Sequence, residues 1–260
     1  MVTTARTVVA GLCALTIAGS FAASASAQTA EVKEKPPMYT YEASWVMPRA
    51  TWPDVEKNST VNQKTLEHAM ASGGLIGYGN DSTVIHTGEG ATHDNWFSGM
   101  SAASVLNALD EIYKAGSSTS AVLTAATKHW DNLYVSRYYN WRAGSWKGAY
   151  TRWSAYTLKA DAPSDAMEVL AKSFTVPLME KLLADGAIVE YEIDVEAVHT
   201  ASPAEFYVIV VTPTAEGLDK VNAALSDAVR KAPLVSPALD ASVDFTKHRD
   251  GLVRSMVTYK

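Results

Sequence analysis

The residues of this 260-residue chain best suited to acid–base chemistry are its six histidines. Four of them recur at corresponding places in two halves of the sequence, His86 with His199 and His129 with His248. Histidine suits proton transfer because its unperturbed pKa lies near neutrality. One interpretation places these pairs in equivalent pockets, with His86 as the catalytic acid or base and the other three as ligand contacts. In the other interpretation, a duplicated loop keeps a histidine that caps a helix or bonds to a backbone carbonyl.

The surroundings of the histidines favour the second interpretation for one pair. Asp131 follows His129 by two residues, and Asp250 follows His248 by the same spacing. A local hydrogen bond between imidazole and carboxylate explains that spacing without catalysis.

Metal binding is a further reading of the histidine-rich segment. His86 and His93 are close in sequence, with Glu89 and Asp94 beside them. Imidazole and carboxylate ligands suit zinc and other divalent ions. The spacing matches no established site, however, so we expect no metal.

Other catalytic signatures are missing from the sequence. A haem group would need an axial histidine that faces a pocket, for which His68 and His199 are the candidates, but no motif supports either. The chain also contains no G-x-S-x-G, P-loop, H-E-x-x-H or dinucleotide fingerprint. Serine hydrolase, NTPase and zinc protease activities are therefore poor interpretations, and we expect no cofactor.

Tryptophan and glycine are concentrated in the first half of the chain, where six of the seven tryptophans precede residue 150. Gly77 and Gly79 stand where the second half has Glu190 and Glu192, on one face of a strand. Glycine leaves room there, so we expect an aromatic-lined ligand pocket between the sheet and the helices of the first half. Alternatively, the tryptophans belong to the core and the glycines relieve crowding. The predicted ligand contacts are Trp45, Tyr78, Trp96 and Arg137.

Residues 130–156 interleave aromatic and basic side chains, a pattern that can bind single-stranded nucleic acid or sugars. Two strands joined by a loop at 144–148 explain the pattern equally well, if each strand has one face packed on the core and one face exposed to solvent. Arg137 alternates with aromatic residues on the predicted strand, which makes it a candidate for contacting an anionic ligand group.

The chain contains an internal repeat, which must position these residues. At a shift of 113 residues, positions 66–87 align with 179–200 without a gap, and seven of the 22 positions are identical. A second block, 128–133 against 247–252, aligns at a shift of 119. Duplication followed by small changes in loop length explains both. The identical pairs are Glu67/Glu180, Ala71/Ala184, Gly73/Gly186, Tyr78/Tyr191, Asp81/Asp194, His86/His199 and Thr87/Thr200.

Each copy is predicted to have the element order βαββαβ. Its first helix ends at a glycine, Gly73 or Gly186, and its second helix covers 102–114 or 215–231. The predicted strands are 39–47, 75–78, 95–99 and 133–140 in the first copy, and 151–159, 187–195, 206–211 and 251–259 in the second.

This order is the ferredoxin-like split βαβ unit, one face of whose sheet must be covered. Over 39–260 the chain resembles the dimeric α/β-barrel superfamily, here as two modules fused in tandem. The resemblance implies an α+β fold in which the modules pack sheet to sheet as a pseudo-dimeric barrel. The superfamily includes cofactor-independent monooxygenases, haem-binding chlorite dismutase-like proteins, isomerases, cyclases and proteins of no known activity, so it does not choose a function.

The first 27 residues predict a secretory signal peptide, with Arg6, an apolar stretch at 8–21 and an Ala-Ser-Ala cleavage site at 25–27. An uncleaved anchor is the alternative. We expect export to a bacterial periplasm or outside the cell. The predicted organisation is a signal peptide at 1–27, a flexible lead-in at 28–38, and modules at 39–149 and 150–260.

Charge and cysteine content narrow the classes of partner that the protein could bind. The chain has 22 Lys and Arg against 28 Asp and Glu, and the signal removes only Arg6, so the mature balance is 21 against 28, or −7. This acidity argues against nucleic acids and anionic membranes. Cys13 is the only cysteine and leaves with the signal. No apolar run after residue 27 is long enough to span a membrane.

The sequence therefore predicts an exported protein that binds a small molecule, or a cofactor-independent enzyme of the α/β-barrel type. A non-catalytic interaction module, docking a partner through sheet edges or a helix face, is the main alternative, and haem binding is the other. Two fused modules can cover each other's sheet faces as a pseudo-dimer within one chain, and the sequence leaves the oligomeric state open.

Overall fold

The computed structural model describes residues 32–58, 61–88, 90–116, 120–198, 204–231 and 235–260, except the side chains of residues 235, 257 and 259. Residues 32–260 form one compact unit. The predicted signal peptide, Glu89 and His199 lie outside the described residues.

The predicted order βαββαβ is confirmed in the first repeat. Its strands are β1 (Met38–Val46), β2 (Gly77–Thr83), β3 (His93–Gly99) and β4 (Lys128–Trp141). Its helices are α1 (Trp52–Asn58), α2 (Gln63–Ala71), α3 (Ala102–Lys114) and α4 (Ala121–Thr124), with a 3₁₀ turn, η1 (Arg49–Thr51), before α1. The Ser101 side chain accepts a hydrogen bond from the Ser104 backbone N–H and so begins α3 where the sequence predicts.

The second repeat has the same order. Its strands are β5 (Tyr150–Thr157), β6 (Glu190–Glu196), β7 (Glu205–Thr212) and β8 (Arg249–Tyr259). Its helices are α5 (Ala166–Leu170), α6 (Val176–Ala184), α7 (Ala215–Lys231) and α8 (Val235–Ser242), with a π-helical turn at η3 (Ala171–Thr175) and a 3₁₀ turn at η4 (Phe245–Lys247). Gly73 and Gly186 follow α2 and α6 with φ of 76° and 72°, a left-handed conformation that favours glycine.

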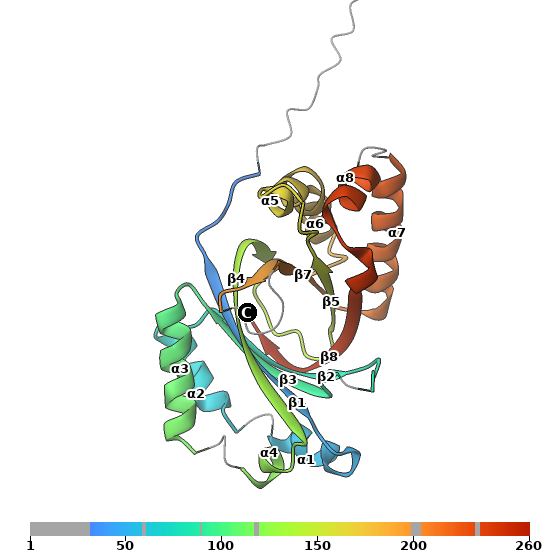
Figure 1. The fold of residues 1–260 in the computed structure, drawn as a ribbon. Helices are drawn as coiled ribbons and strands as arrows, with labels where there is room; N and C mark the ends of the chain where they lie inside the picture. The colour runs from blue at the N-terminus through green and yellow to red at the C-terminus, as the bar shows by residue number, and fades with distance from the viewer. Residues whose placement is uncertain (1–31, 59–60, 89, 117–119, 199–203, 232–234) are drawn as a thin grey trace, which may run out of the picture. The chain divides into compact units, whose positions relative to one another are not determined.

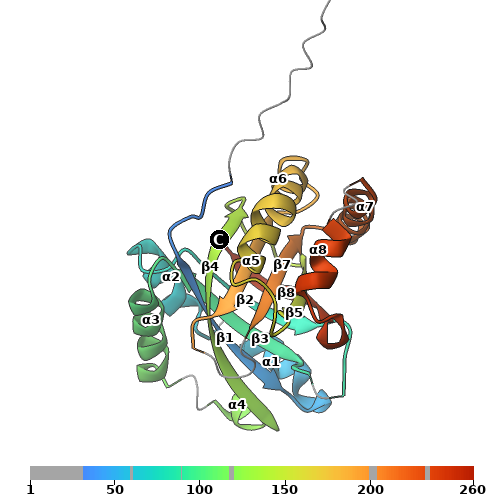
Figure 2. The same ribbon diagram turned by 45° about the horizontal axis from the view of Figure 1, so that its top comes forward.

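The eight strands close into one antiparallel barrel in the order β1-β3-β2-β8-β5-β7-β6-β4 (Figures 1 and 2). The run β4-β1-β3-β2 comes from the first repeat and β8-β5-β7-β6 from the second. The pairs β2·β8 and β4·β6 join them. The expected pseudo-dimeric α/β barrel is therefore confirmed. Closure pairs each of these strands on both sides, so none of them offers the open sheet edge that the interaction-module alternative invoked.

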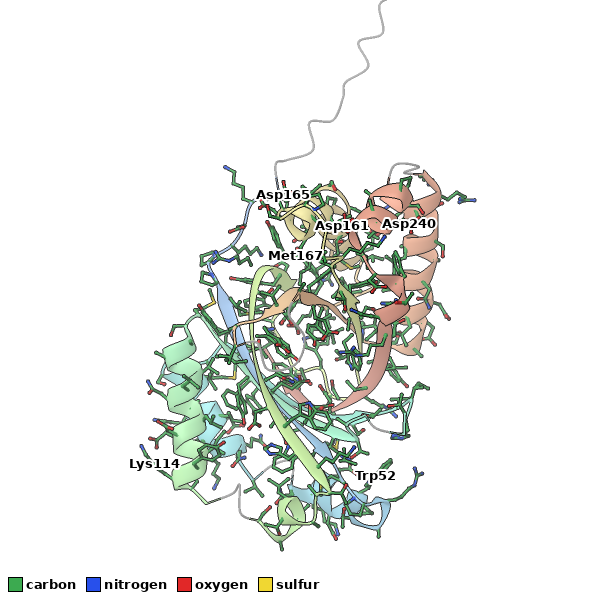
Figure 3. All side chains as sticks on the ribbon, viewed as in Figure 1. Trp52, Lys114, Asp161, Asp165, Met167 and Asp240 are labelled. Carbon is green, nitrogen blue, oxygen red and sulfur yellow. The ribbon has the colours of Figure 1, made fainter. Side chains whose placement is uncertain are left out.

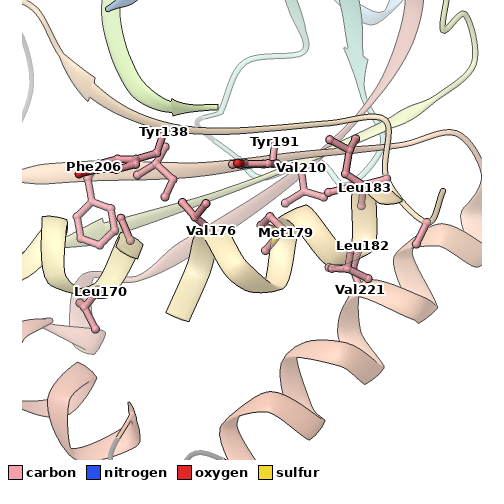
Figure 4. Close-up of a cluster of buried hydrophobic side chains, with 14 of the residues drawn as sticks. Tyr138, Leu170, Val176, Met179, Leu182, Leu183, Tyr191, Phe206, Val210 and Val221 are labelled. Carbon is pink, nitrogen blue, oxygen red and sulfur yellow. The ribbon is translucent and has the colours of Figure 1, made fainter. Parts of the chain in front are cut away.

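Helices cover the outside of the barrel. Leu66 of α2 and Val105 of α3 pack against the outward side chains of the first repeat, such as Tyr41 and Phe97. In the second repeat a larger cluster joins α5, α6 and α7 to β6 and β7, with Met179 and Tyr191 among its members (Figure 4). The space between sheet and helices is therefore filled with buried apolar side chains on both sides of the barrel.

The segment before β1 has contacts that its charged sequence did not predict. The Lys35 backbone N–H donates to the Arg137 carbonyl at 2.9 Å, and the Tyr139 hydroxyl donates to the Pro36 carbonyl at 2.8 Å. Residues 32–37, which belong to the predicted flexible lead-in, thus lie against β4. Among the helices described, none is both long and apolar enough to cross a membrane.

Candidate functional site

The barrel encloses a cavity of about 570 Å³, and all eight strands contribute to its lining. Alternate residues of a barrel strand point inward, and an eight-strand barrel has an interior of the size that holds one small ligand. On β6 the outward residues Tyr191 and Ile193 belong to the core, whereas Glu192 and Asp194 face the cavity. The sheet thus has an apolar outer face and a polar inner face.

Carboxyl groups dominate the polar part of the lining. They come from both repeats and converge from β1, β2, β3 and β6. The set from these four strands is Glu42, Asp81, Asp94, Glu190, Glu192, Asp194 and Glu196, and Asp250 of β8 also lines the cavity.

Aromatic rings supply much of the remaining wall: Trp96, Trp130, Tyr134, Trp153 and Tyr207. The Trp96 indole lies across Gly79 of the neighbouring strand, where an added Cβ would come within 2.6 Å of the ring. The Trp96 Nε1–H donates to Asp81 Oδ2 at 3.0 Å. We expected the glycine at 79 to leave room for a ligand, but the structure shows that a tryptophan of the same repeat occupies that room.

An ion cluster occupies one end of the barrel. The Lys260 ammonium bonds to both Glu190 and Glu192, and all three side chains are buried. The ammonium also lies over the rings of Trp96 and Trp141, 5.6 and 5.2 Å from their centroids. This end of the cavity therefore carries its own counter-charge.

Loop residues and strand ends form the opposite end. Ile85 and Thr87, from the loop that follows β2, contribute to the lining. Arg249 at the start of β8 pairs with Glu205 of β7 at 2.9 Å, and the Tyr207 hydroxyl donates to the same carboxylate at 2.5 Å. The Arg249 guanidinium is thus engaged at the rim.

Burial raises the pKa values of three carboxyl groups in the middle of the cavity. It raises the pKa of Asp81 to about 6, although the hydrogen bond from Trp96 opposes the shift. The pKa of Asp94 is raised further, by burial and then by the charge of Glu42. Burial and neighbouring carboxylates also raise the pKa of Asp194. These groups repel one another, so each resists ionisation while its neighbours are charged.

At the Lys260 end, burial and the charge of Glu192 raise the pKa of Glu190. Burial opposes ionisation of Glu192 as well, but Lys260 more than compensates and lowers its pKa. Within the cluster, Glu192 is therefore the stronger acid and Glu190 the weaker.

The structure places the predicted catalytic residue outside the barrel. His86 is exposed, and its ring lies 4.9 Å from that of Trp52, the first residue of α1 (Figure 3). His93 is buried, with its ring 5.4 Å from that of Trp52 and its Nδ1 3.0 Å from Thr92 Oγ1. Neither imidazole lines the cavity.

The pair His129 and His248 occupies equivalent places in the two repeats, also outside the cavity. His129 stacks on Trp45 at 3.8 Å between centroids, and its Nε2 lies 3.0 Å from Asp131. His248 stacks on Tyr156 at 4.5 Å. The His248 Nε2 lies 3.4 Å from Asp250, and its Nδ1 lies 2.9 Å from the Ala155 carbonyl oxygen. These contacts are the local ones that the His-x-Asp spacing suggested.

Of the four residues predicted to line the pocket, only Trp96 faces the cavity. Tyr78, 1% exposed, packs against α2 and α3, and Trp45 lies on the same outer face. Arg137 is exposed in a bulge of β4 and pairs with Glu34 at 3.3 Å. The structure thus corrects our placement of the pocket, because apolar packing fills the space between sheet and helices.

Sequence reasoning missed the carboxyl groups as site residues. Two signals were present: Asp81 and Asp194 are among the identical positions of the repeat, and β6 alternates acidic with apolar residues. An acidic face is ordinarily assigned to solvent, and only barrel closure turns this one inward.

Comparison with solved structures supports the fold. A candidate monooxygenase from Lactobacillus acidophilus NCFM superposes with a TM-score of 0.61 at 12% identity, over 87% of this chain and 97% of that one. A candidate monooxygenase from Fusobacterium nucleatum gives 0.59 at 7%, over 87% and 95%. An anthrone oxidase-like protein gives 0.53 at 10%, over 86% and 93%. No family model and no curated protein sequence matches the chain. At these identities the likeness establishes the tandem α/β-barrel fold alone.

The barrel cavity offers neither haem nor a metal ion a histidine ligand among the described residues, and the haem-ligand candidate His199 lies outside them. No described histidine lines the cavity, and His68 is exposed on α2. Within the same residues, no group of three or more His, Cys, Asp or Glu side chains is arranged to hold a metal.

Proposed function

We propose that this protein binds a small organic molecule inside its barrel. The observation that carries the proposal is the cavity of about 570 Å³, lined by every strand and by residues of both repeats. Ligand sites are typically concave, with apolar and aromatic walls and a few polar groups that fix orientation. Trp96 and Trp153 supply such walls, and the carboxyl groups supply the polar contacts.

The similar structures add modest support. Two are described as candidate monooxygenases and one as an anthrone oxidase-like protein, so this fold is associated with small organic substrates. This structural similarity does not assign a reaction to this protein, because function depends on the site and not on the fold.

Native mass spectrometry tests the proposal. The protein is purified from its natural source, and its native mass is compared with its denatured mass. An added mass that leaves on denaturation is the expected result. If the native mass is bare and a broad metabolite library adds no mass either, the proposal fails.

A second candidate function is a cofactor-independent enzyme that transfers protons. The observation that favours it is Asp81, a buried carboxyl group in the cavity whose pKa is raised to about 6. General acids and bases work best with a pKa near the working pH. Wild-type protein incubated with the compound found in the barrel is expected to convert it, whereas Asp81→Asn is expected not to convert it even at a concentration that saturates the variant. Equal conversion by both proteins would remove Asp81 from that role.

We also propose that the protein is exported, on the strength of residues 1–27. N-terminal sequencing of the protein from its natural source is expected to begin at Gln28. A sequence that begins at residue 1 or 2 would contradict this.

A further inference from the structure

Two aspartates of the cavity share an unusual state. Asp81 on β2 and Asp194 on β6 are each 4% exposed, and both line the cavity. In each side chain, Oδ1 is buried with no hydrogen-bond partner among the described residues, although a nearby hydroxyl, of Ser255 for Asp81 and of Ser136 for Asp194, lowers the pKa of each carboxyl group. A buried carboxyl oxygen without a donor is costly, so each such atom marks a place where a ligand's donor would be favourable.

The two aspartates face each other across the barrel. β2 and β6 are four strands apart in the closed ring of eight, so they lie on opposite walls. Asp81 pairs in register with Asp94 on β3, and Asp194 pairs with Tyr207 on β7, which fixes both at the same level of their repeats. Groups bound to these two carboxyls would therefore belong to the two ends of one ligand that spans the cavity.

The acids in the middle of the cavity form no direct ion pair with a described lysine or arginine, although the charge of Lys260 lowers the pKa of Asp194. Lys260 forms ion pairs with Glu190 and Glu192, and Arg249 forms an ion pair with Glu205. Within the described part of the chain, no lysine or arginine forms an ion pair with Asp81 or Asp194, or with Glu42 or Asp94 between them. A bound cation would relieve the repulsion among these carboxyl groups.

The lining indicates an organic cation and not a metal ion. The described residues provide no cluster suited to a metal. The indole rings of Trp96 and Trp153 line the cavity, and aromatic faces attract ammonium groups as well as the apolar carbon chains that connect them.

We propose that the ligand is a small organic diamine, with one ammonium group donating to Asp81 and the other to Asp194. This inference rests on the proposed function, since it names the chemical class of ligand for the same cavity.

The test is isothermal titration calorimetry at pH 7.5 with a fixed set of probes. The set consists of 1,4-diaminobutane, 1,5-diaminopentane, butylamine and 1,4-butanediol. A diamine is expected to bind at least about tenfold more tightly than butylamine, and the diol is expected not to bind, because only a diamine places a charged donor at both aspartates. This comparison uses the wild-type protein alone, so it does not depend on the folding of any variant.

Variants locate the site. Asp81→Asn and Asp194→Asn are each expected to weaken the binding of the tighter diamine about 10- to 100-fold, and the double variant is expected to abolish it. Asp161→Asn is the matched control, because Asp161 is exposed near α5 and α8 and does not line the cavity (Figure 3). It is expected to leave the affinity unchanged. Diamine affinity that is unchanged in the double variant would overturn the inference.

The outcomes also separate this inference from the proposed function. If no diamine binds but native mass spectrometry finds a neutral or anionic compound in the barrel, the diamine inference is wrong and the proposed function stands. If divalent metal ions alone bind at these aspartates, the inference is again wrong. If neither the diamines nor any copurified compound occupies the barrel, both fail.

Discussion

Asp81 and Asp194 hold equivalent positions in the two repeats and face the same cavity from opposite walls of the barrel. The sequence around them has diverged, since Gly79 and Thr83 in the first repeat correspond to Glu192 and Glu196 in the second. The barrel is therefore symmetric in its strands and in this pair of acids, and asymmetric in the rest of its lining. The asymmetry places the Lys260 ion cluster at one end, and no described lysine or arginine forms an ion pair with Asp81 or Asp194.

Without a bound ligand, the protein should be least stable at the pH values at which the carboxyl groups of its cavity are ionised. Burial raises the pKa of Asp81 to about 6 from 3.8. A raised pKa in the folded state means that ionisation favours unfolding, so stability is fully present below pH 3.8 and is lost as pH rises through 6. The loss for this group is about 3 kcal/mol above pH 7. Asp81→Asn should therefore be more stable than wild type at pH 7.5, and the gain should shrink at pH 5. Urea unfolding at both pH values measures this, and an identical gain at each would contradict it.

His93 should give the free energy of unfolding the opposite pH dependence, with stability lost as the pH falls. Burial, and then the charge of nearby His86, lower its pKa from 6.5 to about 4. A base with a lowered folded pKa costs stability as pH falls from 6.5 towards 4, because the unfolded chain takes up the proton first. The equivalent residue in the second repeat is Phe206. His93→Phe should flatten the loss of stability over that range, by up to about 3 kcal/mol at its acid end. If the free energy of unfolding of wild type and variant changed in parallel with pH, the imidazole would already be protonated in the folded protein, and the prediction would be wrong.

The close approach of Gly79 and Trp96 should make that glycine hard to replace. Gly79→Ala would put Cβ within 2.6 Å of the indole, which must then move within the barrel wall. Overpacking of this kind costs about 1–3 kcal/mol. Gly88→Ala is the control, since nothing lies within 4 Å of its added Cβ. Chemical denaturation should show a loss for the first variant only, with a shifted tryptophan emission.

The ion cluster at the end of the barrel should respond to loss of its single cation. Lys260→Met would leave Glu190 and Glu192 buried together without a counter-charge, which costs about 3–5 kcal/mol when a buried pair loses one partner. Adding Glu192→Gln should restore most of the loss. Lys231→Met, at a position whose side chain is 72% exposed, should cost little. An equal effect of both lysine changes would contradict the account of the cluster.

Much of the fold could be predicted from the sequence because the relevant signals are local. The helices at 102–114 and 215–231 have the predicted boundaries, and the glycines at 73 and 186 end their helices as expected. Duplication then favours the pseudo-dimeric barrel, since a lone unit leaves a sheet face uncovered.

The site could not be predicted in the same way. Alternation shows that Tyr191 and Glu192 point to opposite faces but not which face meets solvent and which lines a cavity. Tyr78 is aromatic and close to glycines, yet it faces the helices. Asp81 is acidic and looks like a surface residue, yet it faces the interior. Only the closed ring of strands settles which face is enclosed. The catalytic role of His86 stays a prediction.

The most direct test of the central claim is whether a copurified compound depends on the cavity itself. Ile209 lines the cavity at the position equivalent to Trp96, so Ile209→Trp would fill part of the cavity with a further indole. Native mass spectrometry of wild type is expected to show an added mass that is absent from Ile209→Trp and present in the surface variant Asp161→Asn. An added mass retained in full by a folded Ile209→Trp would show that the ligand lies elsewhere, and would contradict a binding site inside the barrel.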